Sequence, residues 1–141
     1  MSIDVRHAVV ADAPRLAALL DELGYGVEPE MVEVELRGDD AEVVVADDDG
    51  VVVGLLAMHT RRHFQRAAPV LSIDALVVGE SHRGRGVGAM LVHHAVDVAM
   101  ASGAKLVDLN SSVTRVDARR FYERLGFEVV SHHFRRALAD R

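Results

Sequence analysis

The sequence contains no cysteine, and this absence removes several classes of site at once. Disulfide bonds, catalytic thiolates and zinc or iron–sulfur centres built on cysteine all require the missing side chain. A chain without cysteine is compatible with the reducing conditions of the cytoplasm, where we expect this protein to lie. Its chemistry must therefore depend on other side chains and on the backbone.

Long hydrophobic runs and excess positive charge are missing as well. No segment approaches the roughly 18 consecutive apolar residues of a membrane span, so we expect no membrane insertion. The first residues, MSIDVRHAVVADAP, do not combine a basic segment with a long apolar run, so we expect no signal peptide. The formal net charge of −6 argues against nucleic acid as the main partner, because a phosphate backbone binds to basic surfaces.

Half of the 141 residues are hydrophobic, which predicts one packed domain over residues 1–141. Periodicity and turn residues give the order β-α-α-β-β-β-α-β-α-β, a mixed α/β (α+β) fold in which a hairpin precedes helical crossovers. The predicted strands are residues 3–8, 42–46, 51–59, 70–78, 105–109 and 127–136, the last forming one strand or two. The predicted helices begin at Asp12, Glu28, Val87 and the capping-box pattern Thr114-x-x-Asp117.

Two details of this prediction concern surfaces. Met31, Val34 and Leu36 are candidates for the inward-facing residues of the second helix. The polar stretch 61–68 predicts a loop after the hairpin, and its basic cluster Arg61-Arg62-His63-Phe64-Gln65-Arg66 is either simply exposed or borders a pocket for an anionic substrate.

A glycine- and arginine-rich loop separates the strand 70–78 from the helix that follows. It reads Arg83-Gly84-Arg85-Gly86-Val87-Gly88-Ala89. The start of a helix presents free backbone N–H groups and the positive end of the helix dipole, and two arginines add fixed charge. The loop therefore predicts a phosphate-binding cradle.

A dinucleotide-binding fingerprint is one interpretation of this loop, because Gly84-x-Gly86-x-x-Ala89 fits G-x-G-x-x-G/A and Asp108 follows about twenty residues later. The first glycine of that fingerprint follows its strand almost directly, whereas residues 79–83 intervene here. The chain is also too short for both halves of a doubly wound sheet. We therefore reject this interpretation, which leaves a nucleotide-binding oxidoreductase as a remote alternative.

The loop instead resembles a signature of the GCN5-related N-acetyltransferases, the GNAT family. Arg83-x-x-Gly86-x-Gly88 is similar to the family's Q/R-x-x-G-x-G/A pyrophosphate-binding motif. Downstream, the segment from Ala118 to Phe127 is similar to the A-x-x-F-Y-x-x-x-G-F pattern of the family's C-terminal helix. The resemblance implies a mostly antiparallel sheet of six to seven strands with about four helices, splayed between strands four and five.

The resemblance also implies acetyl-CoA as co-substrate and a set of residues that bind it. Backbone N–H groups from about Arg85 to Ala89 would hold the pyrophosphate, and the edge of the fourth strand would pair with the pantetheine amides. Asn110 would reach the pantetheine arm, whereas Arg115 stands where many family members carry asparagine. The implied CoA-binding residues are Leu76, Val77, Val78, Arg83, Gly84, Arg85, Gly86, Val87, Gly88, Ala89 and Asn110.

The reaction implied is direct transfer of the acetyl group to a primary amine in a ternary complex. Tyr122 is the candidate general acid, because a phenol with pKa ~10 is protonated at neutral pH and can donate to the leaving thiolate, whose conjugate acid lies near ~8.5. Asp74 is the candidate base, in a strand where many relatives carry glutamate, and a purely structural role for it is equally open. His59 and His63 are the other candidate bases.

Several partners and alternatives stay open at this point. The acceptor is a small-molecule or peptide amine, and a homodimer is possible because dimers are common in the family. A non-catalytic CoA-binding module would keep the loop without needing Tyr122. We expect no metal: His59-x-x-x-His63 has ligand spacing only on a helix, and the pairs at 93–94 and 132–133 point to different faces.

Overall fold

The computed structural model describes residues 2–112 and 114–139. The chain forms two compact units, Met1–Leu109 and Asn110–Arg141. The first unit contains a five-stranded sheet, three α-helices and two short 3-10 turns, and the second contains one helix followed by an extended segment.

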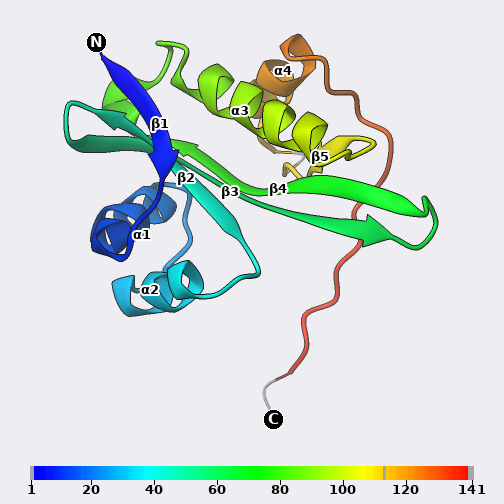
Figure 1. The fold of residues 1–141 in the computed structure, drawn as a ribbon, viewed down its shortest axis with the longest axis horizontal. Helices are drawn as coiled ribbons and strands as arrows, with labels where there is room; N and C mark the ends of the chain where they lie inside the picture. The colour runs from blue at the N-terminus through cyan, green and yellow to red at the C-terminus, as the bar shows by residue number, and fades with distance from the viewer. Residues whose placement is uncertain (1, 113, 140–141) are drawn as a thin grey trace. The chain divides into compact units, whose positions relative to one another are not determined.

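The sheet of the first unit follows the chain order β1-β2-β3-β4-β5, with antiparallel neighbours except for the parallel pair β4–β5. Helix α3 covers one face of this sheet, and helices α1 and α2 cover the other (Figure 1). A proline in the first turn opens both α1 and α2, where its missing N–H costs nothing.

The strands are β1 (Ile3–His7), β2 (Glu42–Asp48), β3 (Val51–His63), β4 (Ala68–Val78) and β5 (Val107–Leu109). The helices are α1 (Ala13–Glu22), α2 (Pro29–Arg37) and α3 (Val87–Ala101), and the 3-10 turns are η1 (Val10–Asp12) and η2 (Glu80–His82).

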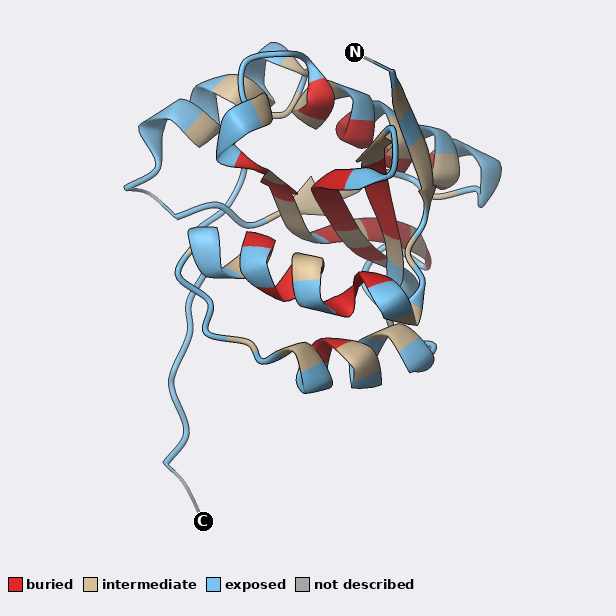
Figure 2. Ribbon diagram, turned by 90° about the vertical axis from the view of Figure 1, so that its left-hand side faces the viewer, coloured by how far each residue is buried: buried red, intermediate tan, exposed pale blue. Residues whose placement is uncertain are grey.

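Two hydrophobic cores lie on the two faces of the sheet, as the alternation of side chains along each strand requires. The α3 side buries Leu56, Leu71 and Leu91 completely. The opposite side buries Leu16 and Leu19 of α1 with Leu55 and Val77 of the strands. Figure 2 shows these buried positions concentrated in the strands and on the inner faces of α1 and α3.

Strands β4 and β5 pair over three positions only, from Leu71↔Val107 to Ile73↔Leu109. Beyond Ile73, no described strand pairs with β4 on this side. On its other side β4 carries an irregularity: Ala57 pairs with Ala75 and Met58 with Ile73, so Asp74 is an extra residue. Such a bulge bends the strand and increases its twist. The predicted divergence of strands four and five is thereby confirmed.

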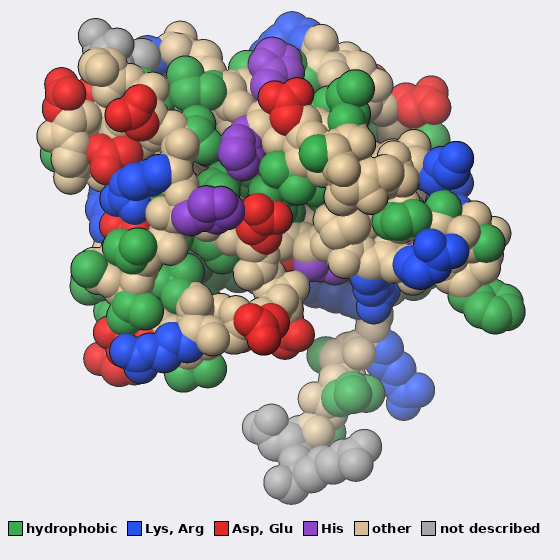
Figure 3. All heavy atoms as spheres, in the orientation of Figure 1, with side chains coloured by type: hydrophobic (Ala, Val, Ile, Leu, Met, Phe, Trp, Pro, Cys, Tyr) green, Lys and Arg blue, Asp and Glu red, His purple; other side chains and the backbone are tan. Residues whose placement is uncertain are grey.

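The predicted loop over residues 61–68 is wrong. Strand β3 continues to His63, a turn follows, and β4 begins at Ala68. The long β3–β4 ladder supplies backbone hydrogen bonds for the polar residues, and Arg62 closes the turn by donating to the Ala67 carbonyl at 2.7 Å. Figure 3 shows Lys and Arg side chains gathered toward the end of this hairpin. Phe64, in the turn that joins the two strands, is fully exposed.

The predicted inward face of helix α2 is wrong for Met31 and Val34 and right for Leu36. Met31 and Val34 are 59% and 69% exposed, whereas Val32 is buried and Leu36 packs beside it. Val32 and Leu36 are about one helical turn apart and therefore lie on the same face of α2, and this face packs against the core.

The second unit contains helix α4 (Val116–Arg124). The predicted capping box is wrong, because Arg115 is the N-cap and the Thr114 hydroxyl bonds to Ser112 instead. At the other end of α4, Gly126 occupies the predicted C-terminal cap position, with φ +94° in the left-handed region. The predicted last strand, 127–136, is wrong for the described residues, since this segment forms no ladder with another strand.

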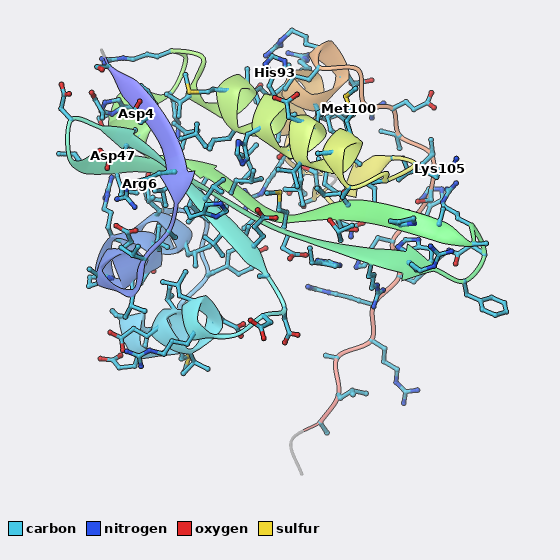
Figure 4. The ribbon with its side chains drawn as sticks, in the orientation of Figure 1. Asp4, Arg6, Asp47, His93, Met100 and Lys105 are labelled. Carbon is cyan, nitrogen blue, oxygen red and sulfur yellow. The ribbon has the colours of Figure 1, made fainter. Side chains whose placement is uncertain are left out.

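Arg6 connects three segments at one end of the sheet. Its guanidinium donates to both Asp12 oxygens, at 2.9 and 3.0 Å, and to Asp47 at 2.9 Å. Figure 4 shows Arg6 and Asp47 side by side, from β1 and β2. The bonds from Arg6 lower the pKa of the Asp12 carboxyl, against burial, which raises it. Asp12 is the N-cap residue of α1, as predicted, but its side chain makes no capping bond to the helix and accepts from the Val9 N–H at 2.8 Å instead.

We expect Arg6→Met to reduce the free energy of unfolding by about 2 kcal/mol at pH 7, because it leaves the nearly buried Asp12 carboxylate without its partner; the partial exposure of Arg6 keeps the loss below that of a fully buried pair. A lowered native pKa stabilises the fold above about pH 4 and less as the pH falls. The difference between wild type and variant should therefore shrink below pH 4 in urea titrations. Arg119→Met, which loses only an exposed pair with Glu123, should change stability by less than about 0.5 kcal/mol.

Candidate active site

The loop before α3 is built on left-handed glycines. Gly84 and Gly86 have φ +76° and +82°, a conformation that other residues adopt only with strain. A Cβ at either position would meet no atom within 4 Å, so backbone conformation and not crowding requires glycine here. Gly86 is the N-cap of α3 and no side chain caps the helix, so the first N–H groups of α3 have no partner within the helix. These donors suit an anion.

The two loop arginines differ in their contacts. Arg83 donates to the Val78 carbonyl at 3.0 Å and to the Glu22 carboxylate of α1 at 3.1 Å. Arg85 is exposed and makes no ion pair or hydrogen bond with the part of the chain that the structure describes. Arg83 therefore anchors the loop, and Arg85 is the loop cation that is available to a ligand.

A second contact holds the loop from the other side. His82 Nε2 lies 3.1 Å from an oxygen of Asp48, the last residue of β2, so the contact joins η2 to the end of that strand. The sequence did not indicate this pair or the Glu22–Arg83 pair, because each joins residues that are distant in the chain. Together they hold the loop against two different elements before any ligand binds.

The predicted pantetheine-binding residues Leu76, Val77 and Val78 lie on the part of β4 that has diverged from β5. The β5-facing edge of this segment therefore has no paired strand among the described residues. An extended amide chain adds to such an edge as a further strand would. The segment ends beside the cradle, since Val78 is bonded to Arg83.

Asp74 and His59 form a pair across β4 and β3. The distances from His59 Nδ1 to the two Asp74 oxygens are 2.9 and 3.0 Å. Both side chains are partly exposed, at 32% and 43%. Both had been predicted as candidate bases, but the pairing was not predicted, because the residues between them were expected to form a loop of undefined register.

Tyr122 lies on α4, held by the structure of the helix end. The Phe127 N–H donates to the Tyr122 carbonyl and the Gly126 N–H to the Glu123 carbonyl, the two bonds of a Schellman motif. The Tyr122 ring packs edge-to-face on Phe121 and Phe127, with centroids 5.1 and 5.7 Å away. Burial raises the pKa of the Tyr122 hydroxyl, and the charge of Arg115 opposes that rise. The phenol is therefore protonated at neutral pH.

The predicted site residues divide between the two units. Asp74, the β4 edge and the loop 83–89 lie together in the first unit, whereas Asn110 and Tyr122 belong to the second. Asn110 follows directly after β5, as predicted.

The histidines do not gather into a metal site among residues 2–112 and 114–139, where no group of three or more possible ligands occurs. His93 and His94 instead line an open groove of about 570 Å³ between β1 and α3, with Gly86, Ala89 and Asp97 on its wall. Figure 4 marks His93 on α3. No helix within the described parts of the chain is long and apolar enough to cross a membrane.

A family model described as "Acetyltransferase (GNAT) family" matches residues 14–127. The chain belongs to the GNAT family. It is 31% identical over 140 residues to an aminoalkylphosphonate N-acetyltransferase from Salmonella typhimurium, a match that covers 96% of this chain and 91% of the relative. It is also 31% identical over 122 residues to a streptothricin acetyltransferase from Streptomyces lavendulae, covering 84% of this chain and 60% of that protein.

Solved structures share the GNAT fold. A ribosomal-protein-alanine N-acetyltransferase from Brucella melitensis superposes with a TM-score of 0.84 at 22% identity, covering 97% of this chain and 100% of that one. An aminoglycoside N-acetyltransferase in complex with CoA gives a TM-score of 0.84 at 19% identity, covering 97% and 95%.

This GNAT protein is an N-acetyltransferase, and acetyl-CoA is its co-substrate. The prediction of an enzyme is confirmed, and the alternatives of a non-catalytic module and an oxidoreductase are set aside. The loop and strand edge fit this co-substrate, because they offer N–H donors to a pyrophosphate and an unpaired edge to its amide chain.

We expect Gly86→Ala to weaken acetyl-CoA binding at least tenfold by calorimetry, because a left-handed alanine strains the backbone whose N–H groups face the anion. Gly50→Ala is the matched control. Gly50 has φ +92° in the β2–β3 turn and equally open space around its Cβ position. Both variants should lose about 1 kcal/mol of stability, and only Gly86→Ala should lose affinity. Equal affinities would contradict the cradle.

Proposed function

We propose that this enzyme acetylates a small primary amine that also carries an anionic group, by direct attack of the amine on acetyl-CoA. The proposal rests on the cationic surface that Arg61, Arg62 and Arg66 form on the β3–β4 hairpin, beside the His59–Asp74 pair. The similarity to an aminoalkylphosphonate N-acetyltransferase over nearly the whole chain supports it and suggests aminoalkylphosphonates as the first acceptors to test.

The cations of this surface differ in availability. The Arg62 guanidinium is engaged by the turn, whereas Arg61 and Arg66 have no ion pair with any described side chain. Arg61 follows His59 by two residues on β3, so the two side chains lie on the same face of the sheet, about 6.8 Å apart along the strand. A short acceptor could place its anion at Arg61 and its amine at His59.

Each remaining residue then has a role in the transfer. The N–H groups of Val87, Gly88 and Ala89 with Arg85 hold the pyrophosphate, and the edge at Leu76–Val78 positions the thioester and polarises its carbonyl. Gly84 and Gly86 shape the loop, Arg83 anchors it, and Asn110 bonds to the pantetheine arm. Asp74 takes part in removing the amine proton, and Tyr122 gives a proton to the thiolate. We also propose that residues 1–141 function as a single domain.

The homodimer and the cytoplasmic location predicted from the sequence remain proposals beside this one. Family resemblance supports the first, and the absence of cysteine is compatible with the second. Sedimentation velocity measures the oligomeric state directly.

We expect Tyr122→Phe to lower kcat about 100-fold, because it removes the proton donor and keeps the ring that packs on Phe121 and Phe127. Acetyl-CoA should bind with an unchanged Kd by calorimetry. A variant with wild-type kcat at pH 7 would contradict the assignment of Tyr122 as the general acid.

We expect Arg61→Ala to raise KM for 2-aminoethylphosphonate about tenfold, the loss of one charge-assisted contact, while KM for acetyl-CoA stays constant. Propylamine, which lacks the anion, should be a poorer substrate for the wild type and insensitive to the substitution. A screen in which streptothricin or kanamycin is acetylated well and 2-aminoethylphosphonate is not would overturn the anionic acceptor and retain the acetyltransferase.

A further inference from the structure

We propose that His59 is the group that takes the proton from the acceptor amine, and that Asp74 is the positioning residue that orients it. The inference rests on the proposed function, since it assigns the base for that transfer. It changes the role expected of Asp74 from the sequence, where this carboxylate was itself the candidate base.

The hydrogen bond fixes which nitrogen of His59 is available. An ionised carboxylate can only accept, so Nδ1, which lies 2.9 and 3.0 Å from the Asp74 oxygens, carries the proton in the neutral ring. Nε2 then presents its lone pair. Among the described residues, no side chain or backbone group is bonded to Nε2, and the side chain is 32% exposed. The ring is thus held at one nitrogen and open to a substrate at the other.

The bulge in β4 creates this pair. In the regular register His59 lies opposite Ser72, and Ser72 is engaged by Asp108 of β5 at 2.6 Å. The extra residue Asp74 turns its carboxylate toward β3 at the point where β5 has ended. The same irregularity therefore opens the strand edge for acetyl-CoA and aims a carboxylate at His59.

Three other charged groups lie near the pair, two of them on the same face of the sheet as His59 and one, Glu42, on the opposite face with Met58. Arg61 is the next residue on the same face of β3, and Asp108 approaches through Ser72 from β5. Glu42 begins β2 opposite Met58, next to His59 in the chain. Asp74 is the one carboxylate among them that is bonded to the imidazole. A neutral imidazole is also better matched to neutral pH than a carboxylate, because the reference pKa values are ~6.5 and ~3.9.

With His59 as the base and Tyr122 as the acid, each proton and each electron pair of the acetyl transfer is accounted for. The amine nitrogen forms a bond to the thioester carbonyl carbon, and His59 Nε2 takes the proton that the nitrogen then releases. The C–S bond breaks with its electron pair on sulfur, and that thiolate takes a proton from Tyr122. The amine and the acetyl donor become an amide and CoA, and solvent returns His59 and Tyr122 to their starting forms.

The test compares His59→Gln with Asp74→Asn, using 2-aminoethylphosphonate at saturating acetyl-CoA. We expect His59→Gln to lower kcat at least 100-fold and to remove one acidic limb from the pH profile of kcat/KM, because that limb reports the loss of a proton from the base. Asp74→Asn should lower kcat about tenfold with KM unchanged and should retain the limb, because the imidazole of His59 is still present but is no longer oriented. The limb of the amine itself should be common to all variants.

His7→Gln and Asp4→Asn are matched controls on β1, where both side chains are exposed and neither has an ion pair among the described residues. Both should keep wild-type kcat and pH profile, and all four variants should keep the acetyl-CoA Kd within about twofold and the wild-type circular dichroism spectrum. If Asp74→Asn removes the limb and His59→Gln does not, Asp74 is the base and the inference is overturned.

A second readout does not depend on activity. Long-range nitrogen–proton NMR correlations of the free protein should show neutral His59 protonated at Nδ1, and Asp74→Asn should shift the ring toward the Nε2–H tautomer. A wild-type ring protonated at Nε2 would overturn the inference even in an active enzyme. Absence of turnover with every amine would instead overturn the proposed function, while the NMR measurement would still decide the geometry of the pair.

Discussion

The divergence of β4 from β5 is the constraint on which the first unit's site depends. A sheet edge inside a domain is normally covered, because unpaired backbone groups are costly when they are buried. Here β5 ends at Leu109 while β4 continues to Val78, so no strand within residues 2–112 and 114–139 pairs with the β5-facing edge from Asp74 onward. In the proposed function, the amide-bearing arm of acetyl-CoA completes this open edge.

The bulge at Asp74 affects both the path of β4 and the position of a side chain beside His59. It twists β4 at the point where pairing with β5 stops, and it brings a carboxylate to His59 on the neighbouring strand. The strand then leads directly into the loop that η2 and α3 hold. That loop is fixed on both sides, by Glu22 through Arg83 and by Asp48 through His82, so its left-handed glycines are not free to relax. Pre-organisation of this kind reduces the loss of backbone conformational entropy that accompanies ligand binding.

Sequence reasoning predicted the parts of this fold that local chemistry decides. The glycines at 84 and 86, the start of α3 and the glycine at the end of α4 all depend on a few consecutive residues. The β3–β4 hairpin, the buried face of α2 and the His59–Asp74 pair depend instead on register between distant residues. A polar run such as 61–66 carries no alternation that fixes register, so its strand and the pairing beyond it were not predictable. The segment after Phe127 had the composition of a strand but no described partner, and a strand requires one.

The proposed acid, Tyr122, must start with its proton and the proposed base, His59, must start without one, and their surroundings differ. Tyr122 packs between aromatic rings, so burial favours its neutral hydroxyl, while the charge of Arg115 favours the phenolate that forms once the proton has left. His59 is partly exposed and is bonded at Nδ1 to the Asp74 carboxylate, which leaves Nε2 for the amine proton. The surroundings of each group thus suit one direction of proton transfer.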